Sequence, residues 1–328
     1  MRRRVAAIDC GTNSLRLLIA DIDTGRATLA DVDRRMEIVR LGQGVDRAGR
    51  LAPDALDRTM GALDGYARII AASGADAVRM VATSATRDAE NSADFVRRVK
   101  EVLGVPPEVL TGDEEARLSF TGATAELAGC RDSAPPYLVA DIGGGSTEFV
   151  LGGPAGGGTA AGGRAAVSEV TAAASVNIGC VRMTERHLRS DPPSEREVAA
   201  ASADIDAAIG VAARQVPARQ ARTLVGLAGS VTTVAAIAMG LPAYDAARIH
   251  HARITARQVH EVTERLLAQS REQRARIGVM HPGRVDVIGG GALILDRIMT
   301  LLGFGEVLVS EHDILDGIAW SLAAPSGR

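Results

Sequence analysis

The chain has 328 residues, of which 46% are hydrophobic and 23% charged, and its formal net charge is −3. This length suits two α/β domains better than one core. The negative charge argues against nucleic acid as a partner, because proteins that bind it carry a basic excess or a basic stripe. No apolar stretch approaches the roughly 18 residues of a membrane span, and the 3 cysteines show neither disulfide nor zinc spacing. We therefore expect a cytoplasmic protein with no nucleic-acid or membrane partner.

The chain opens on an apolar run that ends in an Asp and a small polar turn. Val5–Asp9 leads into Gly11-Thr12-Asn13-Ser14, and an alternating run, Leu15-Leu17-Ile19, follows. This pattern predicts a β-hairpin. The same Asp-x-Gly-x-x-Ser design returns 132 residues later (141 − 9), where Asp141 precedes Gly143-Gly144-Gly145-Ser146. Two copies of one design indicate a shared function and not two incidental tight turns.

Each of these turns has the composition of a phosphate cradle. Glycines allow backbone N–H groups to point at one place, and Ser or Thr hydroxyls add further donors. The Asp at the end of each strand, Asp9 or Asp141, suits Mg²⁺, because a hard cation bound beside phosphate takes one or two protein carboxylates. If the two hairpins face each other, they would hold one phosphate chain.

Helix and strand signals alternate between the two hairpins. Apolar residues at three- and four-residue intervals predict a helix over 53–72, with Pro53 in its first turn. A short buried strand is expected at 77–82, ending in Thr83-Ser84-Ala85-Thr86-Arg87. Asn91 or Ser92 then caps a helix through Leu103.

The second half of the chain also alternates strand and helix signals and has a larger share of helix. The Gly-rich stretch 152–163 is interpreted as an elongated hairpin tip. Capping boxes at Ser194–Glu197 and Thr255–Gln258 open two helices. Strand-glycine-helix units are expected at 224–230 and 285–291, and a final helix at 315–322.

Glycine turns after strands, in two halves that each open on a hairpin, indicate an α/β protein of actin-like ATPase fold. Such a fold consists of two ribonuclease-H-like domains that face each other across a cleft. We expect domain I to span 1–123 and domain II 124–328, with the C-terminal helix able to pack back on domain I. The sequence has no Rossmann G-x-G-x-x-G fingerprint. A P-loop is excluded because the only lysine of the chain, Lys100, does not lie in a G-x-x-x-x-G-K-[ST] motif.

Four ordered motifs resemble the exopolyphosphatase and guanosine pentaphosphate phosphohydrolase (Ppx/GppA) family, in particular its short actinobacterial members with two domains. They are Ala7–Ser14, Ala82–Asn91, Gly112–Arg117 and Asp141–Glu148, and Ser175–Glu185 is similar to a fifth. The resemblance implies a phosphohydrolase that releases terminal orthophosphate from inorganic polyphosphate, or converts guanosine pentaphosphate into the tetraphosphate. It also implies Mg²⁺ as cofactor and a water activated by a glutamate.

The resemblance assigns roles to residues of this sequence. Glu115 matches the carboxylate that orients or deprotonates water, and Arg87 matches a phosphate-binding arginine. The expected metal ligands are Asp141, Glu148 and Asp9. The remaining phosphate-binding residues are expected in the two turns: Thr12, Asn13, Ser14, Gly143, Gly144, Gly145 and Ser146.

Several alternatives stay open on sequence alone. A nonhydrolytic sensor of polyphosphate or alarmone and an actin-like ATP phosphotransferase would share the same turns. Arg117 could contact phosphate or hold Glu115, and Thr83 and Ser84 could be ligands or only a turn. The basic run Arg265–Arg276 is interpreted as a solvated face, or as a track for long polyphosphate in a homodimer; a monomer would favour short chains.

Overall fold

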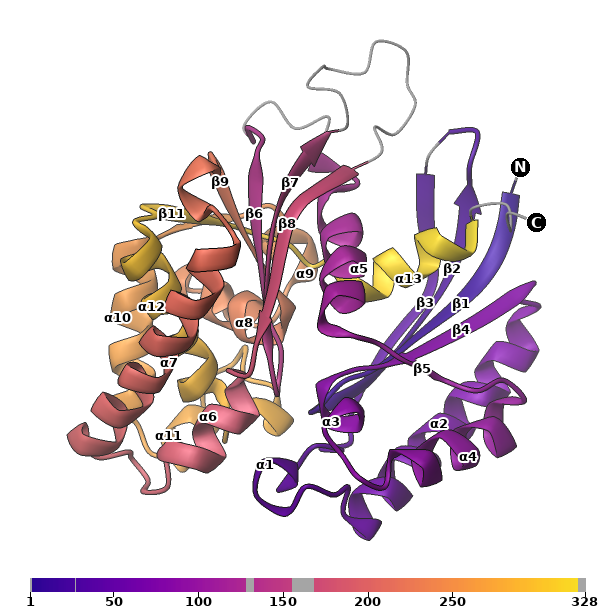
Figure 1. Cartoon of the computed structure of the whole chain (residues 1–328), viewed down its shortest axis with the longest axis horizontal. Coiled ribbons are helices and arrows are strands. Elements are labelled where there is room, and N and C mark those ends of the chain that lie inside the picture. The colour runs from indigo at the N-terminus through magenta and orange to yellow at the C-terminus, as the bar shows by residue number, and fades with distance from the viewer. Residues whose placement is uncertain (1, 27, 128–132, 155–167, 324–328) are drawn as a thin grey trace. The chain divides into compact units, whose positions relative to one another are not determined.

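The computed structural model describes residues 2–26, 28–127, 133–154 and 168–323. It divides into two compact units (Figure 1). Unit 1 comprises Met1–Cys130, Pro154–Glu169 and Asp313–Arg328, and unit 2 comprises Arg131–Gly153 and Val170–His312. Most of the stretch predicted as a hairpin tip, from residue 155 onward, lies outside the described residues. Each unit is built on one β-sheet.

The sheet of unit 1 has five strands in the order β3-β2-β1-β4-β5. Strand β1 pairs antiparallel with β2 and parallel with β4, as the first predicted hairpin requires. The strands are β1 (Arg2–Cys10), β2 (Ser14–Asp23), β3 (Thr28–Ile38), β4 (Ala77–Ala82) and β5 (Glu108–Val109). The helices are α1 (Val45–Ala48), α2 (Pro53–Ser73), α3 (Ser84–Arg87), α4 (Ser92–Leu103), α5 (Gly112–Thr124) and α13 (Ile314–Ala323).

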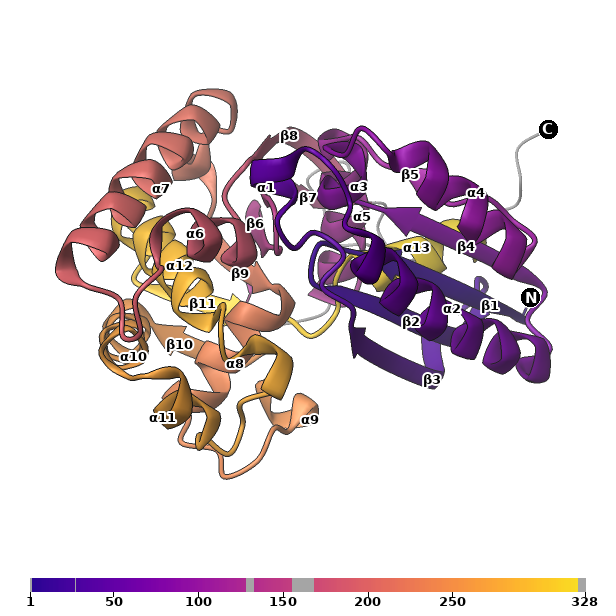
Figure 2. The same cartoon turned by 90° about the horizontal axis from the view of Figure 1, so that it is seen from below.

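Alternation along β1 divides unit 1 into layers. Ala6, Ile8 and Cys10 point to one face of the sheet, where α2 and α4 pack. Val5 and Ala7 point to the other face, which α13 covers. Figure 2 shows α2 and α4 together on one side of the strands. Because both faces are covered, the strands read as nearly continuous apolar runs in the sequence.

The sheet of unit 2 has six strands in the order β10-β11-β9-β6-β7-β8. Strand β6 pairs antiparallel with β7, which confirms the second hairpin, and parallel with β9. The strands are β6 (Tyr137–Ile142), β7 (Thr147–Pro154), β8 (Ser168–Val176), β9 (Thr223–Leu227), β10 (Arg253–Thr255) and β11 (Glu306–Val309). The α-helices are α6 (Cys180–His187), α7 (Glu195–Gln215), α8 (Ala228–Ala238), α9 (Ala246–Ile249), α10 (Ala256–Ala268), α11 (Arg271–Ala275) and α12 (Ile288–Leu302), and the 3₁₀ turns are η2 (Ala218–Gln220) and η3 (Pro282–Arg284).

The two sheets repeat one strand order. In unit 1 it is β3-β2-β1-β4-β5, and in unit 2 it is β8-β7-β6-β9-β11, with β10 added at the edge. In each unit a hairpin supplies the central strand, and the next strand in the order is parallel to it. The α/β class predicted from the sequence is therefore confirmed as a duplicated architecture.

Several elements predicted from local sequence signals are present in the structure. The strand at Ala77–Ala82 and both predicted capping boxes, at Ser194 and Thr255, are present in the structure. Asn91 is the N-cap of α4, but its side chain does not cap the helix and instead bonds the backbone of Leu51.

The strand expected at 285–287 is wrong, because this stretch is a turn and residues 288–291 begin α12. Gly290 and Gly291 serve close packing there. A Cβ on Gly291 would lie 2.1 Å from the Ser230 Oγ of α8, and one on Gly290 would lie 2.8 Å from the Thr184 Oγ1 of α6. Within the described part of the chain, no helix is long and apolar enough to cross a membrane.

Candidate active site

The turn of the first hairpin, Gly11–Ser14, is held by hydrogen bonds to its carbonyl groups. Gly11 N–H donates to Ser14 O at 3.0 Å and closes the hairpin. The N–H groups of Val39 and Arg40 donate to Asn13 O at 3.1 and 2.9 Å, and Gly42 N–H donates to Thr12 O at 2.8 Å. Among the described residues, the N–H groups of Thr12 and Asn13 donate to no backbone carbonyl. The turn therefore has two oriented donors available for an anion.

The turn of the second hairpin, Gly143–Ser146, repeats this arrangement. Gly143 N–H donates to Ser146 O at 3.0 Å, and the first N–H groups of α6 donate to the carbonyl groups of Gly143 and Gly144 at 2.9 to 3.1 Å. Arg182 Nε adds a bond to Gly145 O at 2.7 Å. The close approach of α6 requires glycine at its N-cap, because a Cβ on Gly179 would lie 2.4 Å from the Gly144 carbonyl carbon. Among the residues that the structure describes, the N–H groups of Gly144 and Gly145 donate to no backbone carbonyl group.

The acidic residue of the first hairpin is paired with an arginine. Asp9 lies opposite Arg16 in the β1–β2 register and is 3% exposed. Arg16 Nε and Nη2 donate to Asp9 Oδ2 at 2.9 and 2.6 Å, and Arg16 Nη1 donates to Asp313 Oδ2. Within the described chain, the buried Oδ1 of Asp9 has no hydrogen-bond partner. One oxygen of this predicted metal ligand is thus engaged by Arg16, and the other could accept a cation.

These charges act on one another through a buried network. Burial raises the pKa of Asp9 above its usual value, although Arg16 opposes the shift. Burial also lowers the pKa of Arg16, but attraction to Asp313 and Asp9 outweighs it, so the net shift is upward. For Asp313, burial raises the pKa, but Arg16 and the Leu315 N–H lower it by more. Arg16 therefore stays protonated between two carboxyl groups.

The second hairpin has a carboxylate at the position that Arg16 occupies in the first. Asp141 lies opposite Glu148 in the β6–β7 register, so both side chains leave the same face of the sheet. Asp141 is 7% exposed and Glu148 is 1% exposed. Ser175 Oγ on β8 donates to Glu148 Oε1 at 2.7 Å. Two neighbouring buried carboxylates form a hard oxygen donor set, and this set fits Mg²⁺.

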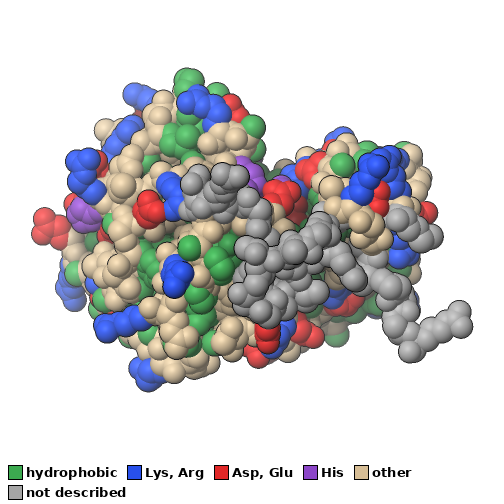
Figure 3. All heavy atoms as spheres, turned by 90° about the horizontal axis from the view of Figure 1, so that it is seen from above, with side chains coloured by type: hydrophobic (Ala, Val, Ile, Leu, Met, Phe, Trp, Pro, Cys, Tyr) green, Lys and Arg blue, Asp and Glu red, His purple; other side chains and the backbone are tan. Residues whose placement is uncertain are grey.

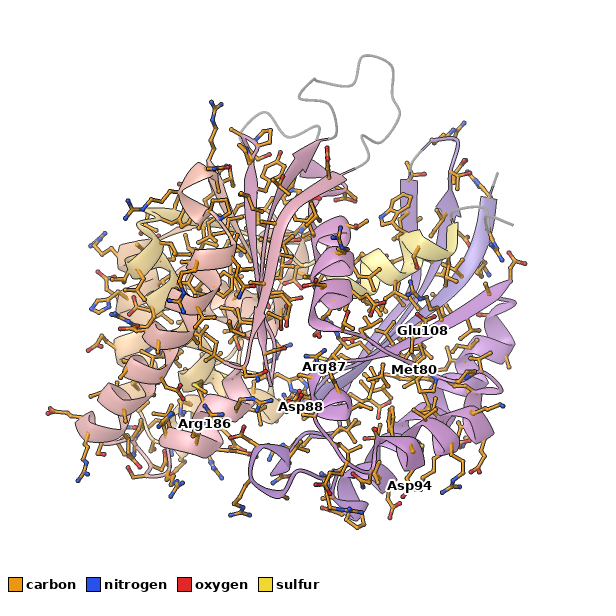
Figure 4. The ribbon with its side chains drawn as sticks, viewed as in Figure 1. Met80, Arg87, Asp88, Asp94, Glu108 and Arg186 are labelled. Carbon is orange, nitrogen blue, oxygen red and sulfur yellow. The ribbon has the colours of Figure 1, made fainter. Side chains whose placement is uncertain are left out.

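Glu115 and Arg87 contact each other in unit 1. Glu115 lies in the first turn of α5, which Thr111 caps in a capping box with Glu114. Arg87, at the end of α3 next to Asp88 (Figure 4), donates from Nη1 to Glu115 Oε2 at 3.1 Å and to Leu110 O at 2.8 Å. Glu115 is 8% exposed, whereas Glu114 and Arg117 are exposed. Of the two neighbouring glutamates, Glu114 caps the helix and Glu115 points inward.

Strand β4 brings α3 beside the first turn. Thr83 N–H donates to Cys10 O at 3.2 Å, and the hydroxyls of Thr12 and Ser84 lie 3.0 Å apart. Unit 1 thus gathers its predicted residues around the ends of β1 and β4, and unit 2 gathers its own around the β6–β7 turn.

Sequence reasoning missed four residues of these networks. Arg16 could have been found from the hairpin register, since it is the cross-strand partner of Asp9. Ser175 and Arg182 belong to the fifth motif, but nothing marked their contacts with Glu148 and the second turn. Asp313 carries no local signal, because it lies 297 residues from Arg16.

The Arg265–Arg276 run is largely engaged in ion pairs. Arg271 pairs with Asp286 at 2.9 Å and Arg274 with Asp191 at 3.1 Å, and Arg276 pairs with Glu272. Arg274 is also buried. The run is therefore not a solvated face throughout, because Arg274 is buried against Asp191, and its role as a polyphosphate track stays a prediction.

Two duplicated sheets, each with a hairpin turn of glycine and small polar residues and a buried acid at the end of its central strand, define an actin-like α/β protein. The family model of the Ppx/GppA phosphatase family matches residues 18–324. The chain belongs to this family, which confirms the resemblance seen in the motifs.

Particular relatives span nearly the whole chain. It is 50% identical to exopolyphosphatase 2 of Mycobacterium tuberculosis over 331 residues, which cover 98% of both proteins. The crystal structure of an exopolyphosphatase-like protein is similar with a TM-score of 0.90 and 41% identity, covering 98% of both chains. The PPX-GPPA enzyme of Aquifex aeolicus is similar with a TM-score of 0.76 and 30% identity, covering 98% of this chain and 100% of its own.

Proposed function

We propose that this protein is a Mg²⁺-dependent exopolyphosphatase, which releases terminal orthophosphate from inorganic polyphosphate. The observation that carries the proposal is the buried pair Asp141 and Glu148, which lie opposite each other beside a turn with available N–H donors. Carboxylates at facing positions of one hairpin offer the hard oxygen ligands that Mg²⁺ prefers. The name of the Mycobacterium tuberculosis relative supports polyphosphate as the substrate.

Each set of residues has a task in this reaction. Water attacks the terminal phosphorus, the bond from that phosphorus to the bridging oxygen breaks, and its electron pair stays on the shortened chain. Glu115 orients the water and accepts its proton. Arg87, which is expected to bind phosphate, also holds the Glu115 carboxylate through the contact at 3.1 Å. The turn N–H groups stabilise negative charge on the phosphate oxygens.

The acid pair and Asp9 complete the proposal. Asp141 and Glu148 would hold Mg²⁺, and the buried Oδ1 of Asp9 is a further candidate ligand. When bound, the ion would neutralise charge on the phosphate chain. Arg16 keeps Asp9 in place from the adjacent strand.

The proposal is tested by measuring phosphate release by the purified protein, with Mg²⁺ or with a chelator. The substrates are inorganic tripolyphosphate, long polyphosphate and guanosine pentaphosphate. We expect Mg²⁺-dependent release from polyphosphate, and release from guanosine pentaphosphate would add the second activity of the family resemblance. The Glu115→Gln variant should lose about 10²- to 10⁴-fold in kcat while KM changes by only a few-fold.

The matched control is Glu114→Gln, which changes the neighbouring exposed glutamate and keeps a residue suited to the capping box. It should retain activity. Binding of polyphosphate without any release would instead indicate a sensor. Transfer of phosphate from ATP to an organic acceptor would indicate a phosphotransferase.

A further inference from the structure

A pocket of about 480 Å³ opens in unit 2, where strands β9 and β11 begin. Its lining includes Thr223, the first residue of β9, and Glu306, the first residue of β11. The second turn follows the opposite end of β6, which pairs with β9 from Tyr137 to Asp141. At about 3.3 Å per residue, the pocket and the turn are on the order of 15 Å apart along these strands. The pocket is therefore separate from the candidate active site.

Three arginines and one glutamate give the pocket a positive lining. Arg219 comes from η2, Arg222 from the residues that lead into β9, and Arg253 from the start of β10. Arg253 pairs with Glu306, but Arg219 and Arg222 have no carboxylate partner in the described part of the chain. The negative end of the α12 dipole opposes an anion here, but two uncompensated guanidinium groups outweigh its half charge. Guanidinium groups suit phosphate because they donate in a bidentate fork.

Part of the pocket lining is apolar. Leu301, Leu302 and Phe304 form this part at the C-terminal end of α12. Leu301 is 43% exposed, so its side chain is accessible to a ligand in the pocket. A bare phosphate chain gains nothing from such a wall, whereas a ring system can pack against Phe304 and the leucines. The volume is also in the range of small-molecule sites, about 300–1,000 Å³.

We propose that this pocket binds a phosphorylated ligand with a flat apolar group, the chemistry of a nucleotide. The guanidinium groups of Arg219 and Arg222 hold the phosphates, and the wall of Leu301 and Phe304 packs against the ring. Figure 3 views the molecule from the side on which these strands begin, and there Lys and Arg side chains stand among apolar ones.

The test uses two probes that share a triphosphate and differ in the nucleoside, namely GTP and inorganic tripolyphosphate. Calorimetric titration of the full chain with the Glu115→Gln change, which prevents hydrolysis, counts the sites for each probe. Hydrogen exchange at 219–224 and 301–306 then locates the pocket site. We expect Arg219→Ala/Arg222→Ala to weaken GTP binding at this site by about tenfold or more.

Two further variants make the result specific. Leu301→Ser, at an exposed position, should weaken GTP but not tripolyphosphate. Arg189→Ala/Arg196→Ala removes the same charge from exposed positions of unit 2 outside the pocket and should leave both probes unaffected. Unchanged GTP binding in the Arg219→Ala/Arg222→Ala variant, or an equal loss in the Arg189→Ala/Arg196→Ala control, would overturn the proposal. If instead the proposed hydrolase function were wrong, the protein without the Glu115→Gln change would release no phosphate from polyphosphate, and the pocket site would remain.

Discussion

The two hairpins share a fold, a turn and an acid, but differ in the residue that stands opposite that acid. In the first hairpin Asp9 faces Arg16, and in the second Asp141 faces Glu148. Each partner lies seven residues after its acid in the sequence, so the register is the same and only the charge differs. The first hairpin contains a cation from the protein itself. The second places two buried carboxylates together.

This difference shows how one structural unit, used twice, can supply opposite chemistry. A buried carboxylate next to arginine forms a structural ion pair, whereas two adjacent carboxylates favour a cation from solution. We infer that the first hairpin fixes a charge network and the second recruits the metal. Both keep a turn whose N–H groups can receive phosphate.

The largest effect is expected when the second hairpin is changed to copy the first. Glu148→Arg would place a guanidinium opposite Asp141 and replace one of the two proposed metal ligands. Activity on polyphosphate should fall by more than about a thousandfold, since metal stabilisation of the transition state is worth several kcal/mol. Phosphate release at saturating Mg²⁺ measures this loss.

The control for that change is Glu264→Arg, which introduces the same charge at an exposed position of α10. Because a buried arginine could also disturb folding, Glu148→Gln provides a second variant of nearly equal volume. It should fold normally and need at least about tenfold more Mg²⁺ for half-maximal activity. A wild-type Mg²⁺ response in Glu148→Gln would assign Glu148 to a structural role.

The reverse change removes the arginine from the first hairpin. Arg16→Met leaves Asp9 and Asp313 buried without their shared partner, so the free energy of unfolding should fall by about 3 kcal/mol. Denaturant unfolding measures this change. Arg35→Met, which breaks an exposed pair with Asp33, should cost less than about 1 kcal/mol. Equal effects of the two substitutions would show that the Arg16 network does not stabilise the fold.

A smaller effect is expected from pH. The pKa of Asp313 is lowered in the folded state, mainly because Arg16 outweighs the effect of burial. Its stabilising contribution is therefore present above its ordinary value of 3.8 and is lost as the pH falls through the lower folded pKa. The difference in unfolding free energy between the wild type and Asp313→Asn should be largest near neutral pH and shrink below 3.8. A difference that stays constant down to pH 2 would contradict this linkage.

The parts of the fold that sequence predicted are those with local signals. The hairpin turns, the strand at Ala77–Ala82 and the capping boxes each depend on a few adjacent residues. The strand predicted within 285–291 was wrong because apolar residues before glycines resemble a strand and its turn. Gly291 is instead required by close contact with Ser230 on helix α8. Close packing between helices leaves no periodic signal.

The candidate site follows the same division. Residues within motifs, such as Glu115 and Arg87, were named from the sequence, and the structure places them in contact. The second partner of Arg16, Asp313, could not be predicted from the sequence. Asp313 reaches Arg16 only because α13 packs on the sheet of unit 1. Charge networks that close over long sequence separations are set by tertiary structure alone.

The most direct test of the difference between the hairpins is binding of Mn²⁺, a paramagnetic substitute for Mg²⁺, followed by electron paramagnetic resonance. The wild type, Asp141→Asn and Asp9→Asn would be titrated side by side, with thermal unfolding to verify that each is folded. We expect Asp141→Asn to weaken the ion by at least about tenfold, because it removes a charge from a carboxylate pair. Asp9→Asn should weaken it by less than about threefold, because Arg16 already engages that carboxylate. An equal or larger loss in Asp9→Asn would contradict the assignment of the metal to the second hairpin.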